Sequence, residues 1–167
     1  MTLYIPDASA IIALESACGA AGYHIDDILE SLTDLAVSGN LVCPPLVIKE
    51  CKRLGEGEPT TRWLKASSGH FGQSDDPWEY MEIVLATCPG LLDPDDMDEN
   101  PQVAVLALAL FLRESRGENV VVVTDQWIDN PIRQAMGSAA PLVDVPALPV
   151  EFFILEVTRQ AEESQPA

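Results

Sequence analysis

The stretch VVVVTD at residues 120–125 decides the fold. Four consecutive valines are typical of a strand that is buried on both faces, as the inner strands of a parallel sheet are. The segment before it, residues 101–116, is apolar on nearly every side, so we expect a central helix directly before this strand.

Strands and helices alternate along the rest of the chain. Further short strands are predicted at 3–5, 41–43 and near 142–143, and further helices at 10–17 (with Ser9 as the N-cap), 25–36, 46–54, 62–66, 78–86, 131–136 and 149–160. This alternation predicts a three-layer α/β/α sandwich with a central, mainly parallel sheet of about four strands. We expect one domain over residues 1–160 and a frayed tail over 161–167.

The charge balance limits the possible functions. Nine Lys and Arg residues against 27 Asp and Glu residues give a net charge of -18, which argues against a general nucleic-acid-binding protein and against attraction to an anionic membrane. The longest apolar run, 103–112, is too short to span a bilayer, and the start of the chain does not resemble a signal peptide. We therefore expect a cytoplasmic protein whose four cysteines are free thiols.

Acidic side chains follow the predicted strands. Asp7 comes after the first strand, Asp125 follows the valines, and Glu50 lies on the helix after the second strand. Asp98, in the acid-rich loop 93–99, is a fourth candidate. Ligands of parallel sheets bind beyond the carboxyl ends of the strands, and converging carboxylates require a cation. Because these ligands are all oxygens, we expect Mg²⁺ or Mn²⁺.

Each acid also has a simpler interpretation. Asp7 is placed to interact with the N-terminus of a helix, and Asp125 to cap a turn. Glu50 lies between two lysines, as a solvated helix residue would, and the loop 93–99 has the composition of a solvated loop.

The order of these motifs resembles that of the PIN-domain ribonucleases, and in particular their small single-domain members of the toxin type. The resemblance rests on Asp7 with Ser9 after the first strand, on Glu50, on Thr124-Asp125 after a buried strand, and on the segment NPQVAVLA at 100–107. It covers the chain from Leu3 to about Phe153. Each motif is short, and their order and spacing together carry the specificity.

The resemblance implies a Mg²⁺- or Mn²⁺-dependent endoribonuclease, the toxin of a toxin–antitoxin pair, which is inhibited by a protein partner and in many relatives dimerises. Asp7, Glu50 and Asp125 would hold the metal, while Ser9 and Thr124 would orient carboxylates. One departure matters, because Asn100 stands where the family carries its third acid. Asn100 itself, Asp98 or Asp96 would then fill that place, and loss of one negative charge would weaken metal binding.

Five of the nine basic residues are clustered near Glu50. They are Lys49, Lys52, Arg53, Arg62 and Lys65, with Trp63 among them. We expect this cluster to hold RNA phosphates while the tryptophan stacks on a base. The alternative is a solvated helix face with a tryptophan in the core.

Two other functions remain open at the level of sequence. A PIN-fold protein-binding module that has lost catalysis would agree with Asn100 and with the acidic surface. A metal-dependent phosphatase or a receiver-like phosphate acceptor is disfavoured, because Asp7-Ala8-Ser9 lacks the second aspartate of a D-x-D motif.

Overall fold

The structure is a computed structural model that describes residues 2–55, 57–71, 77–92 and 100–164. Its sheet has three parallel strands in the order β1 (Thr2–Pro6), β2 (Asn119–Thr124) and β3 (Ala147–Pro149). The valine stretch is therefore the central strand, and the mixed α/β class is as predicted.

The sheet has three strands in the described part of the chain rather than about four. The predicted strand at 41–43 is reduced to one parallel bridge between Leu41 and Tyr4. The chain continues directly into Pro44 and Pro45, which lack an N–H to donate, and Pro45 already begins the next helix.

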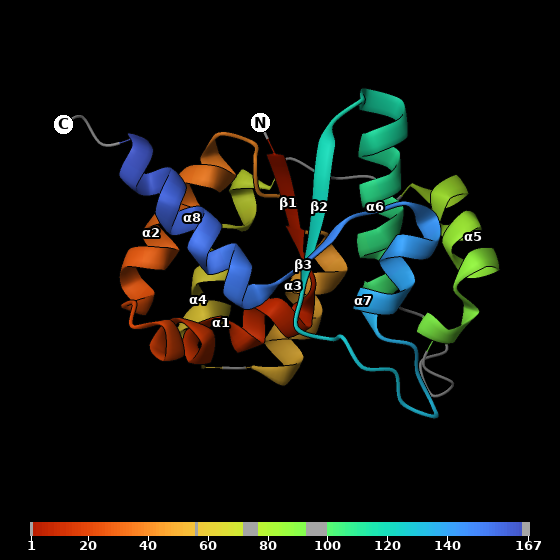
Figure 1. Cartoon of the computed structure of the whole chain (residues 1–167), viewed down its shortest axis with the longest axis horizontal. Coiled ribbons are helices and arrows are strands. Elements are labelled where there is room, and N and C mark those ends of the chain that lie inside the picture. The colour runs from red at the N-terminus through yellow and green to blue at the C-terminus, as the bar shows by residue number, and fades with distance from the viewer. Residues whose placement is uncertain (1, 56, 72–76, 93–99, 165–167) are drawn as a thin grey trace.

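Eight α-helices surround this sheet in the described residues, and Figure 1 shows them on both of its sides. Helix α6 contacts β1 and β2, while α8 contacts β2 and β3. The helices are α1 (Ala8–Ala21), α2 (Ile25–Val37), α3 (Pro45–Leu54), α4 (Pro59–Ala66), α5 (Trp78–Thr87), α6 (Pro101–Arg116), α7 (Met136–Ala139) and α8 (Val150–Ser164).

Helix α6 has the bounds that the sequence predicted. The first ten of its 16 residues, Pro101 to Leu110, are all buried. Asn100 caps the N-terminus, proline occupies the first position, and Gly117 ends the helix in the left-handed conformation with φ 64°. Both ends of α6 are therefore defined by residues that favour a helix start and a helix stop.

Several predicted helix and strand bounds were wrong. Helix α1 begins at Ala8 with Asp7, not Ser9, as its N-cap. Residues 131–135 are irregular and α7 begins at Met136. Residues 142–143 belong to a 3-10 helix that ends at Asp144 with φ 59°, and the strand forms after it as β3.

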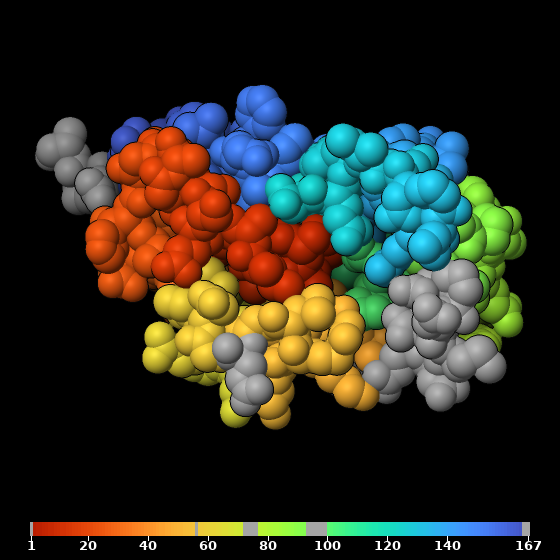
Figure 2. All heavy atoms as spheres, turned by 90° about the horizontal axis from the view of Figure 1, so that it is seen from below, coloured from red at the N-terminus to blue at the C-terminus, as the bar shows by residue number. Residues whose placement is uncertain are grey.

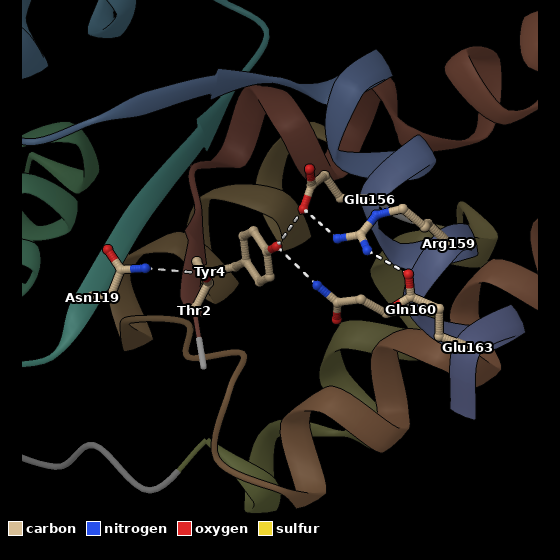
Figure 3. A network of polar contacts seen from close by, with 7 residues as sticks. All are labelled: Thr2, Tyr4, Asn119, Glu156, Arg159, Gln160 and Glu163. Atoms are coloured by element: carbon tan, nitrogen blue, oxygen red, sulfur yellow. Dashed lines mark hydrogen bonds and ion pairs between the residues drawn. The ribbon is translucent and has the colours of Figure 1, made fainter.

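The C-terminal helix is attached to β1 through Tyr4. The Tyr4 hydroxyl donates to Glu156 at 3.2 Å and accepts from Gln160 at 3.2 Å (Figure 3). On the same helix, Arg159 forms ion pairs with Glu156 and Glu163. Burial is the main cause that raises the pKa of Tyr4, so its hydroxyl remains a donor. Helix α8 continues to Ser164, into the predicted tail, and 165–167 lie outside the described residues.

All four cysteines are buried and free, as predicted. Burial raises the pKa of Cys18 to about 11 and that of Cys51 to about 12, so neither forms a reactive thiolate near neutral pH. None of the described helices combines the length and the apolar character needed to cross a membrane.

Truncation of the central helix should be costly. Leu106 is fully buried on α6, so we expect Leu106→Ala to lower the free energy of unfolding by about 2–5 kcal/mol. Leu155→Ala on α8 is the matched control, because its side chain is 49% exposed, and we expect a change within about 0.5 kcal/mol. Urea denaturation measures both, and equal effects would contradict this account of the core.

Candidate functional site

Asp7 lies at the carboxyl end of β1 and is completely buried. Its Oδ1 accepts hydrogen bonds from the Ser9 hydroxyl at 2.6 Å and from the backbone N–H of Ala10 at 2.9 Å. Its Oδ2 accepts from the Thr124 hydroxyl at 2.5 Å and from the Gln102 amide at 3.3 Å. Both carboxyl oxygens are therefore used inside the protein.

The donors around Asp7 are all neutral. Burial is the largest influence on this carboxyl and raises its pKa, although the hydrogen bonds from Ser9, Thr124, Ala10 and Gln102 each act in the opposite direction. A buried carboxylate without a cationic partner is costly, and hydrogen bonds to neutral groups offset only part of that cost.

Ser9 and Thr124 connect Asp7 to the turn after β2. The Ser9 hydroxyl accepts from the backbone N–H of Asp125 at 3.0 Å, and the Thr124 hydroxyl accepts from that of Gln126 at 3.0 Å. Both hydroxyls also donate to Asp7, so Ser9 and Thr124 connect this carboxyl to the turn after β2.

Asp125 follows β2, and its side chain is exposed. Desolvation is the main cause that raises its pKa, with the negative charge of Glu151 as the second cause. Glu50 lies on α3 with its side chain 24% exposed, and both of its carboxylate oxygens accept from the guanidinium of Arg53, at 2.7 and 3.3 Å. Its charge is therefore already paired one turn along the helix.

A cleft of about 540 Å³ lies between α1, α3, the start of α6 and the segment after β2. Its lining includes Ser9, Glu50, Gln102, Asp125 and Arg133. Figure 2 shows α1 (red) between α3 (gold) and the segment after β2 (cyan), with α6 (green) set back between them. Asp7 lies beneath the cleft, where it contacts Ser9 and Gln102 of the lining.

Asn100 does not take part in this arrangement. Its Oδ1 accepts from the backbone N–H of Val103 at 3.1 Å, and its Nδ2 donates to the carbonyl of Leu91 at 3.2 Å. The side chain is a helix cap that also connects α6 to the segment after α5, and it does not line the cleft. Asp96 and Asp98 lie outside the described residues.

Gln102 is the site residue that sequence reasoning missed. It is 5% exposed, and its Nε2 donates to Asp7 at 3.3 Å and to Gln126 Oε1 at 2.6 Å. Its own Oε1 is buried without a hydrogen-bond partner in the described part of the chain, which costs about 1–3 kcal/mol. The available signal was a single polar residue in the otherwise apolar run 101–112.

The five clustered basic residues do not line the cleft. Lys49, Lys52 and Arg53 are exposed on α3, and Arg62 and Lys65 are exposed on α4. Trp63 is half-buried, donates to the Thr33 hydroxyl at 2.8 Å and meets the edge of Phe71, so it is a core residue here rather than a free stacking platform. The basic residue in the cleft is Arg133, which lies outside the predicted cluster.

The described donors do not fit a divalent cation as they stand. Among the described residues, no group of three or more His, Cys, Asp or Glu side chains is arranged to hold a metal ion. Both oxygens of Asp7 already accept hydrogen bonds, Glu50 is paired with Arg53, and Gln102 turns an amide nitrogen toward Asp7. A cation here would have to displace these donors.

The burial of Asp7 predicts a pH-dependent stability. Because its pKa is raised in the folded state, the folded chain keeps this proton at pH values where the unfolded chain has lost it. The stabilising contribution is therefore complete below the unfolded pKa, about 3.9, and decreases as pH rises toward the folded pKa.

We expect wild type to lose stability relative to Asp7→Asn as pH rises above about 4, and the difference to become constant once the folded pKa is passed. Asparagine is a suitable reference because it cannot ionise. Urea denaturation of both proteins over a pH series measures the difference. A difference that is independent of pH, or that changes in favour of wild type, would contradict this interpretation.

The sequence matches no protein-family model and no curated protein. Among solved structures, the chain is similar to the crystal structure of PAE2754 from Pyrobaculum aerophilum, with a TM-score of 0.50 and 20% sequence identity. The match covers 96% of this chain and 100% of the other. At this level of identity the likeness concerns the fold alone, and it extends over nearly the whole chain.

Proposed function

We propose that this chain is a PIN-like domain that has lost metal-dependent catalysis and that uses its cleft to bind a basic protein segment. The observation that carries the proposal is the hydrogen bond from the Gln102 amide nitrogen to Asp7 Oδ2. A metal-dependent nuclease would need an oxygen ligand for its cation at this point instead of an N–H donor. The PIN-like assignment itself is supported by the order of Asp7, Glu50 and Asp125 along a parallel α/β chain.

The surface of the cleft suits a basic partner. Ile12 and Leu54 line it and are 39% and 55% exposed, so they offer apolar contact. Glu50 and Asp125 lie in the same lining, on a chain with a net charge of -18. A cationic partner would compete with Arg53 for Glu50 and would have to avoid Arg133, so the exposed Asp125 offers the more accessible negative charge. A segment that carries both apolar and cationic side chains, such as the inhibitory partner of a toxin, complements both properties.

A synthetic amphipathic peptide of lysine and leucine is a direct probe of the cleft. We expect the double variant Glu50→Gln, Asp125→Asn to bind it about tenfold more weakly than wild type, because two partly exposed charge contacts are lost. The matched control is Glu30→Gln, Asp34→Asn, which removes two exposed acids of α2 that do not line the cleft. Fluorescence anisotropy measures the affinities, and equal weakening in both double variants would show attraction to the acidic surface in general.

A second candidate is the Mg²⁺- or Mn²⁺-dependent endoribonuclease of a toxin–antitoxin pair. One observation favours it, because Glu50 and Asp125 line a cleft directly above Asp7 although the three come from different elements. This function requires that a cation displace hydrogen-bond donors from the carboxylate oxygens of Asp7.

Cleavage of a panel of RNAs with and without Mn²⁺ distinguishes the two candidates. For the binding module we expect no Mn²⁺-dependent cleavage by wild type, Asp7→Asn or Asp125→Asn. Cleavage by wild type that both substitutions abolish would establish the nuclease instead. Calorimetric titration of wild type with Mn²⁺ is an independent check, and we expect no heat of binding.

A further inference from the structure

The side-chain nitrogen of Gln102 lies between two oxygen atoms. It is 3.3 Å from Asp7 Oδ2 and 2.6 Å from Gln126 Oε1, and a primary amide has one N–H for each. The Thr124 hydroxyl donates to the same Asp7 oxygen at 2.5 Å. The amide thus supplies partial positive charge where two oxygens from β1 and from the turn after β2 face each other.

The orientation of this amide follows from its neighbours. If it were turned over while Gln126 kept its orientation, its oxygen would face Asp7 Oδ2 and Gln126 Oε1, and three acceptors would meet with only the Thr124 hydroxyl as a donor. In the orientation present, Gln102 Oε1 has no hydrogen-bond partner among the described residues, although the residue is only 5% exposed. Within the described part of the chain, the hydrogen bonds of this side chain are therefore made by its nitrogen and not by its oxygen.

A carboxylate at this position would reverse the local balance of charge. Gln102→Glu removes both N–H donors and adds a negative charge next to Asp7, so that oxygens from residues 7, 102 and 126 converge. Such a group stays ionised only when a cation joins it. Oxygen ligands of this kind prefer Mg²⁺ or Mn²⁺.

We propose that the Gln102 amide substitutes for a divalent cation at this edge of the sheet, and that the single substitution Gln102→Glu converts the edge into a cation-binding site. This inference rests on the proposed function in one respect, namely that the wild-type site binds no metal. Gln102 is then a positioning residue, because it holds Asp7 and Gln126 in place through hydrogen bonds.

The test compares wild type, Gln102→Glu and Gln160→Glu. The last variant makes the same chemical change on α8, at the contact with Tyr4 and away from the cleft. Without metal, we expect Gln102→Glu to melt below wild type because two carboxyl groups meet. When the Mn²⁺ concentration is about 100 times the dissociation constant of the Gln102→Glu variant, we expect the melting temperature of this variant to rise by about 5 °C. We expect no change in the melting temperatures of wild type and Gln160→Glu. Electron paramagnetic resonance of Mn²⁺ reports the bound ion independently of stability.

Each outcome has a separate meaning. Tight binding of Mn²⁺ by wild type would overturn the proposed function. If wild type and folded Gln102→Glu both fail to bind Mn²⁺, this inference alone is overturned. If Gln102→Glu is unfolded without metal, folding on addition of Mn²⁺ supports the inference. Gln102→Asp, with a shorter reach, serves as the second variant, and failure of both variants to fold or to bind in Mn²⁺ overturns the inference.

Discussion

The arrangement of this site depends on the burial of one carboxyl group that has only neutral hydrogen-bond donors around it in the described part of the chain. Asp7 caps α1, receives a hydroxyl from the end of β2 and receives an amide from the first turn of α6, so three elements meet on two oxygen atoms. Neutral donors make this burial possible but leave the pKa of the carboxyl raised. The same hydrogen bonds that position the elements also occupy the oxygens that a metal would need. The hydrogen bonds that position Asp7 would therefore compete with coordination of a metal ion by the same oxygens.

The main features of the fold could be predicted from the sequence because they depend on long, strongly patterned segments. The valine strand and helix α6 have unmistakable apolar patterns, and the carboxyl ends of parallel strands bring Asp7 and Asp125 to the same edge. The short elements were less accessible. Three apolar residues at 41–43 resemble a strand, yet the prolines after them leave a single bridge. The last strand, β3, ends in a proline and carries little signal of its own.

The site was harder to predict than the fold, because charge was used as the guide to function. Asn100 attracted attention as a replaced acid, but a residue directly before a helix is usually its cap, and this one is. Gln102, two residues later, faces the sheet edge from the first turn and escaped notice because it is neutral. In the same way, Arg133 lies in the cleft although the basic cluster is elsewhere in the chain. The course of the backbone, in helix α6 and in the irregular segment after β2, decided which side chains meet.

The pairing of β1 with β2 has a consequence for folding during synthesis on the ribosome. β1 is made first, whereas the strand that pairs with it comes more than a hundred residues later, as the separation of 117 between Asp7 and Thr124 shows. Contacts between residues this distant in sequence form late in folding, because ordering the intervening chain costs conformational entropy. The apolar strand β1 therefore leaves the ribosome before its partner strand, and it stays unpaired until more than a hundred further residues have been synthesised.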